Sequence, residues 1–122
     1  MNRINTPIGF RYSSDEHGIA NLFLGLEHGV AATRRNSPIE AGTPIVAYVT
    51  DAVRRGTHVC IGMAVGSAEG VNPWGPEYET RTIYEVRWVG APVWVPADEV
   101  WATSTSWSST ALEQLMAAAL AA

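Results

Sequence analysis

The hydrophobic and polar positions in the second half of the chain alternate with the period of a β-strand. Tyr84, Val86 and Trp88 are apolar, whereas the residues between them, Glu85 and Arg87, are charged. Successive side chains of a strand point to opposite faces, so one face of this segment is apolar and the other polar. The pattern predicts a half-buried strand.

Two further runs of β-branched and apolar residues precede this segment. The run 45–49 is apolar on both faces, which predicts a central strand that is covered on both sides. The run 59–66 carries large side chains on one face and only Cys60, Gly62, Ala64 and Gly66 on the other, where a backbone or a ligand can approach closely. Together the three runs predict an antiparallel sheet that curls into a small barrel, with a hairpin at 50–57.

Helical periodicity precedes the first of these strands. Apolar residues recur at the spacing of one helix face: Ile19, Leu22, Phe23 and Leu26. Ser13 and Glu16 have the spacing of a capping box, so we predict a helix over about 14–28 that ends at Gly29. Gly18 and Gly25 lie inside it and weaken it by roughly 1 kcal/mol each relative to alanine.

The C-terminal segment has a second helical pattern. Its apolar stripe consists of Leu112, Leu115, Met116, Ala119 and Leu120. Thr110 and Glu113 repeat the capping-box spacing, and we predict a helix over about 109–121. This helix either packs on the barrel or mediates self-association.

Irregular stretches separate the strands. Residues 90–92, Gly-Ala-Pro, predict a turn into a short apolar run. Residues 68–80 contain two prolines, two glycines, Trp74 and Tyr78, and they predict a long loop. Loops of this length in compact domains usually serve function or are disordered.

Length and charge limit the class of protein. The chain has 122 residues, of which 47% are hydrophobic, and we expect one α+β domain over 1–122. A net charge of −4 argues against a protein that coats nucleic acid non-specifically. No apolar run approaches the ~20 residues needed to span a bilayer and no leader pattern opens the chain, so we expect a cytoplasmic protein without a membrane partner.

The residues that could ligate a metal do not form a pattern. His17, His28 and His58 lack ligand spacing, and the lone Cys60 provides neither an intrachain disulfide nor a zinc framework. We expect no metal site and no cofactor.

The order of the predicted elements resembles that of the PUA-like superfamily, and within it the EVE and ASCH domains. The resemblance is carried by three segments, Gly29–Arg35, Ala41–Tyr48 and Cys60–Val65, and it covers roughly residues 13–101. Thr43 stands where the family usually has aspartate after the glycine. The resemblance implies a curved barrel with flanking helices and a cleft for a nucleobase, in several such domains a modified base that is flipped out of its strand.

Some ASCH-like members are similar in sequence pattern but hydrolyse modified nucleosides, and these carry a lysine in the segment that ends in T-x-R. Val30 occupies the nearest equivalent place here, and the chain contains no lysine. The resemblance therefore implies a binding module in preference to an enzyme, and we assign no catalytic residue.

The ligand-binding candidates are Thr33, Arg34, Arg35, Tyr48, Asp51, Trp74 and Tyr78. Trp74 and Tyr78 would stack on a base, or would close the barrel mouth by ordinary packing. The Thr-Arg-Arg segment 33–35 would bind a phosphate or a base edge, or would end a strand in solvent. Tyr48 fits a core residue better than a pocket residue, and Asp51 fits a turn former better than a base contact.

These residues support three hypotheses of different kinds. The first is a nucleic-acid-binding module that recognises a nucleobase, single-stranded or flipped, and we expect this base to be a modified one. The second is a small ASCH-like hydrolase, which would use Thr33 or Glu85. The third is an interaction protein that forms a homodimer through the C-terminal helix.

Overall fold

The computed structural model describes residues 6–12, 16–34, 38–51, 53–68, 70–100 and 109–121. The strands are β1 (Ile8–Arg11), β2 (Val30–Thr33), β3 (Pro44–Asp51), β4 (Gly56–Ser67) and β5 (Thr82–Pro96). The helices are α1 (Glu16–His28), the 3-10 helix η1 (Gly75–Tyr78), α2 (Ala97–Val100) and α3 (Ser109–Ala121).

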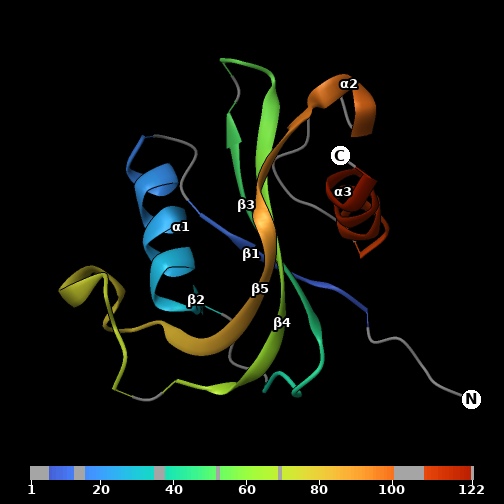
Figure 1. Ribbon diagram of the computed structural model, residues 1–122. Coiled ribbons are helices and arrows are strands. Elements are labelled where there is room, and N and C mark those ends of the chain that lie inside the picture. Colours follow the sequence, from blue (N-terminus) through green and yellow to red (C-terminus); the bar gives the residue numbers. More distant parts are fainter. Residues whose placement is uncertain are drawn as a thin grey trace, which may run out of the picture.

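The five strands form one sheet in the order β1-β3-β4-β5-β2, and this sheet is nearly closed into a barrel (Figure 1). The predicted α+β class, the curved barrel and the helices near both ends of the chain are confirmed. We call the gap between β1 and β2, the two ends of the strand order, the seam. Across it, the Tyr12 hydroxyl accepts a hydrogen bond from the backbone N–H of Ala32 at 3.3 Å.

The sheet is mixed, whereas the sequence predicted an antiparallel one. The strand β1 runs parallel to β3, with Ile8 opposite Ile45 and Arg11 opposite Tyr48. The other three pairings are antiparallel. Alternation of side chains reports which residues share a face but not the direction of the neighbouring strand, so periodicity alone could not reveal the parallel pair.

The predicted turn at residues 90–92 is wrong, because β5 continues through it. In the register of β4 with β5, Val59 pairs with Val93 and Ile61 with Val89. One β4 residue therefore faces three residues of β5, which makes an extended bulge. Gly90 has a φ of +72°, and Pro92 has no N–H to donate. Both residues suit a bulge, which bends the strand without ending it.

The main core lies between the sheet and α1. Phe10, Leu22, Ile45 and Ala47 are buried there with the small side chains of Cys60 and Ala64. The glycine-lined face of β4 therefore points into this core, where the bare backbone allows close packing. The helix α1 ends at His28 and Gly29 follows with a φ of +69°, as the sequence predicted. Ser13 of the predicted capping box lies outside the described residues.

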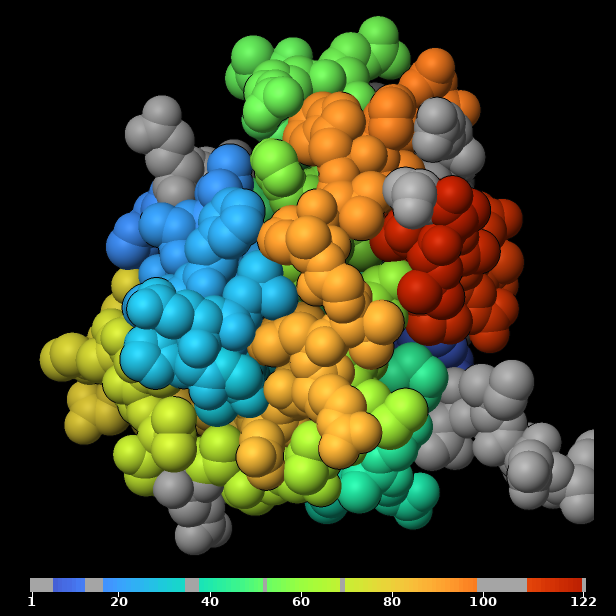
Figure 2. All heavy atoms as spheres, viewed as in Figure 1, coloured from blue at the N-terminus to red at the C-terminus, as the bar shows by residue number. Residues whose placement is uncertain are grey.

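The helix α3 covers the opposite face of the sheet. Leu112, Leu115 and Ala119 are buried against a cluster that includes Val46, Tyr48 and Val59. Figure 2 shows α1 and α3 on the two sides of β5. The predicted C-terminal helix is confirmed, and most of its apolar stripe packs on the chain's own sheet. The homodimer through this helix stays a prediction, and of the stripe only Leu120 is largely exposed.

The long loop before β5 is fastened to α1. The Trp74 indole N–H donates to the backbone carbonyl of Asn21 at 2.9 Å, and the Asn21 side-chain amide donates to the Tyr78 hydroxyl at 3.1 Å. The Asn72 side chain accepts from the backbone N–H groups of Trp74 and Gly75. The loop thus has a defined shape, which places η1 beside α1. Within the described residues, no helix has the length and apolarity to cross a bilayer.

Candidate functional site

Three of the predicted ligand-binding residues come together at the seam. Thr33 and Arg34, at the end of β2, and Tyr78, in η1, line one pocket of about 360 Å³. Arg35 lies outside the described residues. The described residues that line it are Gly9, Arg11, Tyr12, Thr33, Arg34, Glu77, Tyr78 and Arg81, and we call this cavity the seam pocket. Its volume falls in the range of small-molecule sites.

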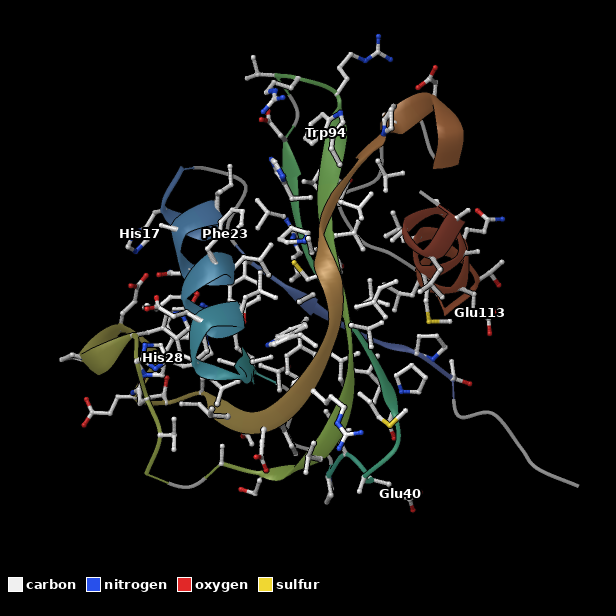
Figure 3. The ribbon with its side chains drawn as sticks, in the orientation of Figure 1. His17, Phe23, His28, Glu40, Trp94 and Glu113 are labelled. Atoms are coloured by element: carbon white, nitrogen blue, oxygen red, sulfur yellow. The ribbon has the colours of Figure 1, made fainter. Side chains whose placement is uncertain are left out.

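Most of the charged residues described in the lining of the seam pocket are arginines. Arg11, Arg34 and Arg81 are cationic, and Glu77 is anionic. Glu77 Oε1 lies 2.6 Å from Nε2 of His17, which projects from α1 (Figure 3). The whole chain has a net charge of −4, so this group of arginines differs from the chain as a whole. Arginine side chains in a pocket suit the binding of an anion.

The tyrosines of the pocket are held by the core beneath it. Burial raises the pKa of Tyr12 well above its ordinary value, and burial likewise raises the pKa of Tyr78. Both phenols therefore stay protonated at neutral pH. The Tyr12 hydroxyl accepts from Ala32 and the Tyr78 hydroxyl accepts from Asn21, so both rings are fixed in place.

Arg81 lies on the ring of Tyr78. The central carbon of its guanidinium is 4.6 Å from the ring centroid, which is a cation–π contact. Arg81 is half-buried and stands immediately before β5. The guanidinium is therefore held over an aromatic ring that is itself hydrogen-bonded to α1.

Trp74 is placed by the structure as a buried packing residue. Its exposed fraction is 8%, and its ring stacks directly on Tyr78 with centroids 4.8 Å apart and an interplanar angle of 24°. A base inserted between the two rings would need about twice the stacking distance of ~3.5 Å, and this gap does not exist. This geometry agrees with the alternative that Trp74 closes the barrel by ordinary packing.

Tyr48 and Asp51 lie away from the seam pocket lining. Tyr48 is buried in the cluster beneath α3, and burial raises its pKa to about 12 while nearby Arg11 opposes the shift. The Asp51 carboxylate accepts a hydrogen bond from the backbone N–H of Arg54 at 3.0 Å, which shapes the β3–β4 hairpin. These positions agree with Tyr48 as a core residue and with Asp51 as a turn former.

Sequence reasoning missed Arg11, Tyr12, Glu77 and Arg81 as members of the site. Arg11 and Tyr12 end a short strand whose partner, β3, is over thirty residues away in the sequence. Arg81 follows the long loop by one residue, and its proximity to the predicted Tyr78 was the one signal in the sequence. The pocket exists because β1, β2 and the loop converge, and no local pattern encodes that convergence.

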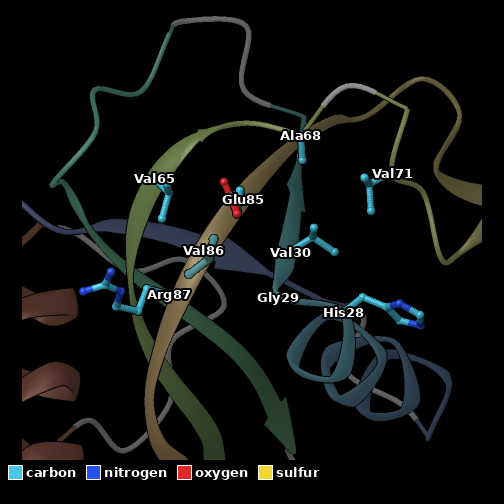
Figure 4. Close-up of a pocket in the computed structure, with 9 residues that line it drawn as sticks. All are labelled: His28, Gly29, Val30, Val65, Ala68, Val71, Glu85, Val86 and Arg87. Carbon is cyan, nitrogen blue, oxygen red and sulfur yellow. The ribbon is translucent and has the colours of Figure 1, made fainter.

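A second cavity of about 470 Å³ lies at the C-terminal end of α1 (Figure 4). Valine is its most frequent lining residue, and we call it the valine pocket; the described residues that line it are His28, Gly29, Val30, Val65, Ala68, Val71, Glu85, Val86 and Arg87. Glu85 belongs to this lining, whereas Thr33 belongs to the seam pocket. Thr33 and Glu85, the two residues that the hydrolase hypothesis would use, therefore line different cavities.

Two further titratable groups, Cys60 and His58, lie outside the lining of both pockets. Cys60 is buried in the main core, and burial raises the pKa of its thiol to about 12, so it is a poor nucleophile. His58 packs edge-on against Trp94 at a centroid distance of 4.8 Å, near the β3–β4 hairpin. In the part of the chain that the structure describes, no three His, Cys, Asp or Glu side chains are grouped to hold a metal ion.

Comparison with protein-family models, with curated proteins and with solved structures finds no match for this chain. The resemblance to PUA-like domains stays a prediction that rests on the sequence segments that carry it.

Proposed function

We propose that this chain is a nucleic-acid-binding module that holds one nucleotide, single-stranded or flipped, in the seam pocket. The observation that carries the proposal is the guanidinium of Arg81 held 4.6 Å over the Tyr78 ring, in a cavity that two further arginines line. A guanidinium in this position can serve as a stacking surface for a base, and the neighbouring arginines can donate hydrogen bonds. A nucleotide needs both, one for the base and the other for its phosphate.

The stacking surface in this proposal is Arg81 rather than a pair of aromatic plates. Unpaired bases stack on arginine planes as well as on aromatic rings. Stacking of one base is worth about 1–3 kcal/mol. Tyr78 beneath Arg81 restricts the guanidinium before the ligand arrives, which lowers the entropy cost of ordering it.

Thr33 and Arg34 supply the polar contacts beside this surface. An arginine can donate two parallel hydrogen bonds to a phosphate or to the acceptor edge of a base. The net charge of −4 means that affinity comes from a few local groups and not from a broad basic face. The PUA-like resemblance adds the expectation that the base is a modified one.

The test is a titration of the full chain, followed by tryptophan fluorescence, with modified and unmodified nucleotides and short single strands at two salt concentrations. Trp74 is a suitable reporter because it stacks on Tyr78, which contacts Arg81. We expect Arg81→Gln to weaken binding at least about tenfold, as loss of one stacked base contact would. Arg87→Gln removes the same charge from the valine pocket and is the matched control.

A shallow dependence of affinity on salt is expected, because few phosphates are contacted. Equal weakening by Arg81→Gln and Arg87→Gln would show that overall charge decides the affinity, and it would refute the seam pocket as the site. A panel without any binding nucleotide or oligonucleotide would refute the proposed function itself.

A further inference from the structure

We infer that the base next to the bound nucleotide occupies a third cavity, beside the seam pocket, so that the ligand is a single strand of at least two nucleotides. The nucleotide in the seam pocket is the one of the proposed function, so the inference rests on that function and extends it. Two observations support it: the cavities share part of their lining, and the linings differ in charge.

The third cavity has a volume of about 440 Å³, and we call it the loop pocket. The end of β4, the loop that follows it and the start of β5 contribute the described residues that line it. Ala68, Val71 and Ile83 give it apolar walls, and Thr82 adds a hydroxyl. Sites of this volume, with apolar walls and a few hydrogen-bonding groups, bind small organic groups, and a nucleobase is such a group.

The wall between the two pockets is formed by Tyr78 and Arg81, which line both. Trp74 stacks on the Tyr78 ring at 4.8 Å, and the Asn21 side-chain amide donates to the Tyr78 hydroxyl. The Arg81 guanidinium lies 4.6 Å over the same ring. A wall fixed in this way keeps the two pockets at a constant separation, as the binding of consecutive units of a polymer requires.

The charges assign different parts of a strand to the two pockets. Among the described residues that line the loop pocket, Arg81 is the one cation and Glu79 the one anion. At the seam pocket, burial raises the pKa of Tyr78, and the charges of Arg81 and Arg34 oppose that rise. Both guanidinium groups therefore lie within electrostatic range of this phenol. A phosphate is favoured beside them, and an uncharged base is favoured in the loop pocket.

Arg81 is placed to contact the linkage between the two nucleotides. A guanidinium can stack on a base with its face and donate hydrogen bonds to a phosphate from its edge. The phosphate that joins two consecutive nucleotides lies between their bases, and Arg81 lies between the two pockets. One arginine can thus serve both nucleotides.

The loop pocket also adjoins the valine pocket. Ala68 and Val71 line both of these cavities (Figure 4), whereas the seam pocket and the valine pocket have no described lining residue in common. The three cavities therefore follow one another in the order seam pocket, loop pocket, valine pocket. Such a series suits a polymer better than a lone mononucleotide.

The experiment measures how the affinity of the full chain depends on strand length, by calorimetry at constant pH and salt. The probes are the nucleotide of the fluorescence panel that binds tightest, and the same nucleotide extended by one, two or four thymidines on its 5′ or its 3′ side. All probes carry the same terminal phosphate.

Two variants place a carboxylate in the loop pocket. Val71→Asp changes a side chain that is 43% exposed, and Thr82→Glu changes an exposed residue that belongs to the loop pocket but not to the valine pocket. Val53→Asp is the charge-matched control, because Val53 is 93% exposed in the β3–β4 hairpin. Circular dichroism verifies that each variant is folded.

We expect the strand of two nucleotides to bind at least about fivefold tighter than the mononucleotide in one of the two directions, as one more bound base would give. Val71→Asp and Thr82→Glu should bring this ratio toward one and leave the affinity for the mononucleotide unchanged. Val53→Asp should change neither quantity.

Equal affinities for the mononucleotide and for every strand would overturn the inference and leave the proposed function in place. A ratio lowered equally by Val71→Asp and Val53→Asp would attribute the gain to the charge of the added phosphates, and it would also overturn the inference. Failure of the whole panel to bind would refute the proposed function and the inference together.

Discussion

The substitution Gly25→Ala separates the local preference of α1 from its tertiary packing. Gly25 lies inside the helix, where alanine is favoured by about 0.8–1.0 kcal/mol, so local propensity predicts a more stable protein. In the folded chain, a Cβ at this position would lie 2.6 Å from the backbone carbonyl oxygen of Val30 and 3.1 Å from the Trp74 ring. The tertiary structure therefore predicts the opposite sign.

The magnitude follows from how little the neighbours can move. Ordinary contact for a Cβ begins at 3.4 Å, so a gap of this kind must open by several tenths of an ångström. Val30 is fixed by the pairing of β2 with β5, and α1 is held by the indole of Trp88, which donates to the Gly25 carbonyl at 3.2 Å. Overpacking of a dense core costs about 1–3 kcal/mol. The helix gain offsets part of this cost, so we expect Gly25→Ala to lower the free energy of unfolding by about 1 kcal/mol.

Urea unfolding followed by circular dichroism measures this loss as a lower midpoint at an unchanged slope. Ala20→Gly on the exposed side of α1 is the control, since it reports the helix term alone and should cost about 1 kcal/mol. A midpoint for Gly25→Ala equal to or above that of the natural chain would refute the argument, because the close approach of α1 and β2 would then carry no cost.

Three further predictions concern residues outside the seam pocket. Burial, assisted by nearby Arg54, lowers the pKa of His58, so as the pH falls the unfolded chain binds this proton before the folded chain does. The free energy of unfolding should therefore fall as the pH drops below about 6.5, the ordinary pKa of histidine. His58→Phe should reduce this dependence on pH, which urea midpoints measured at pH 7.5 and 5.5 would show. Equal slopes would contradict it. Cys60 should resist thiol reagents in the folded protein at pH 8 and react once urea unfolds it, so prompt native labelling would show that the thiol is accessible. Leu115→Ala should cost about 2–5 kcal/mol and Leu120→Ala less than about 0.5 kcal/mol, since the first side chain is fully buried and the second is 60% exposed; similar losses would mean that α3 does not pack on the sheet as described.

Part of the candidate site could be predicted from the sequence. Thr33, Arg34 and Tyr78 do line one pocket, although a loop and a strand edge far apart in the chain contribute them. Trp74 was expected to stack either on a ligand or on the protein, and it is buried against Tyr78. Exposure of an aromatic residue in a loop depends on what the loop folds onto, and here that surface is α1.

The sequence by itself determined the secondary structure of most elements. Alternation and helical spacing are local properties of consecutive residues, which is why α1, α3, β3 and β4 were predicted closely. The direction of β1, the passage of β5 through Gly90 and Pro92, and the membership of Arg11 and Arg81 in one pocket were decided by the tertiary structure. These features arise where segments distant in sequence meet, and their energies come from contacts that no single segment contains.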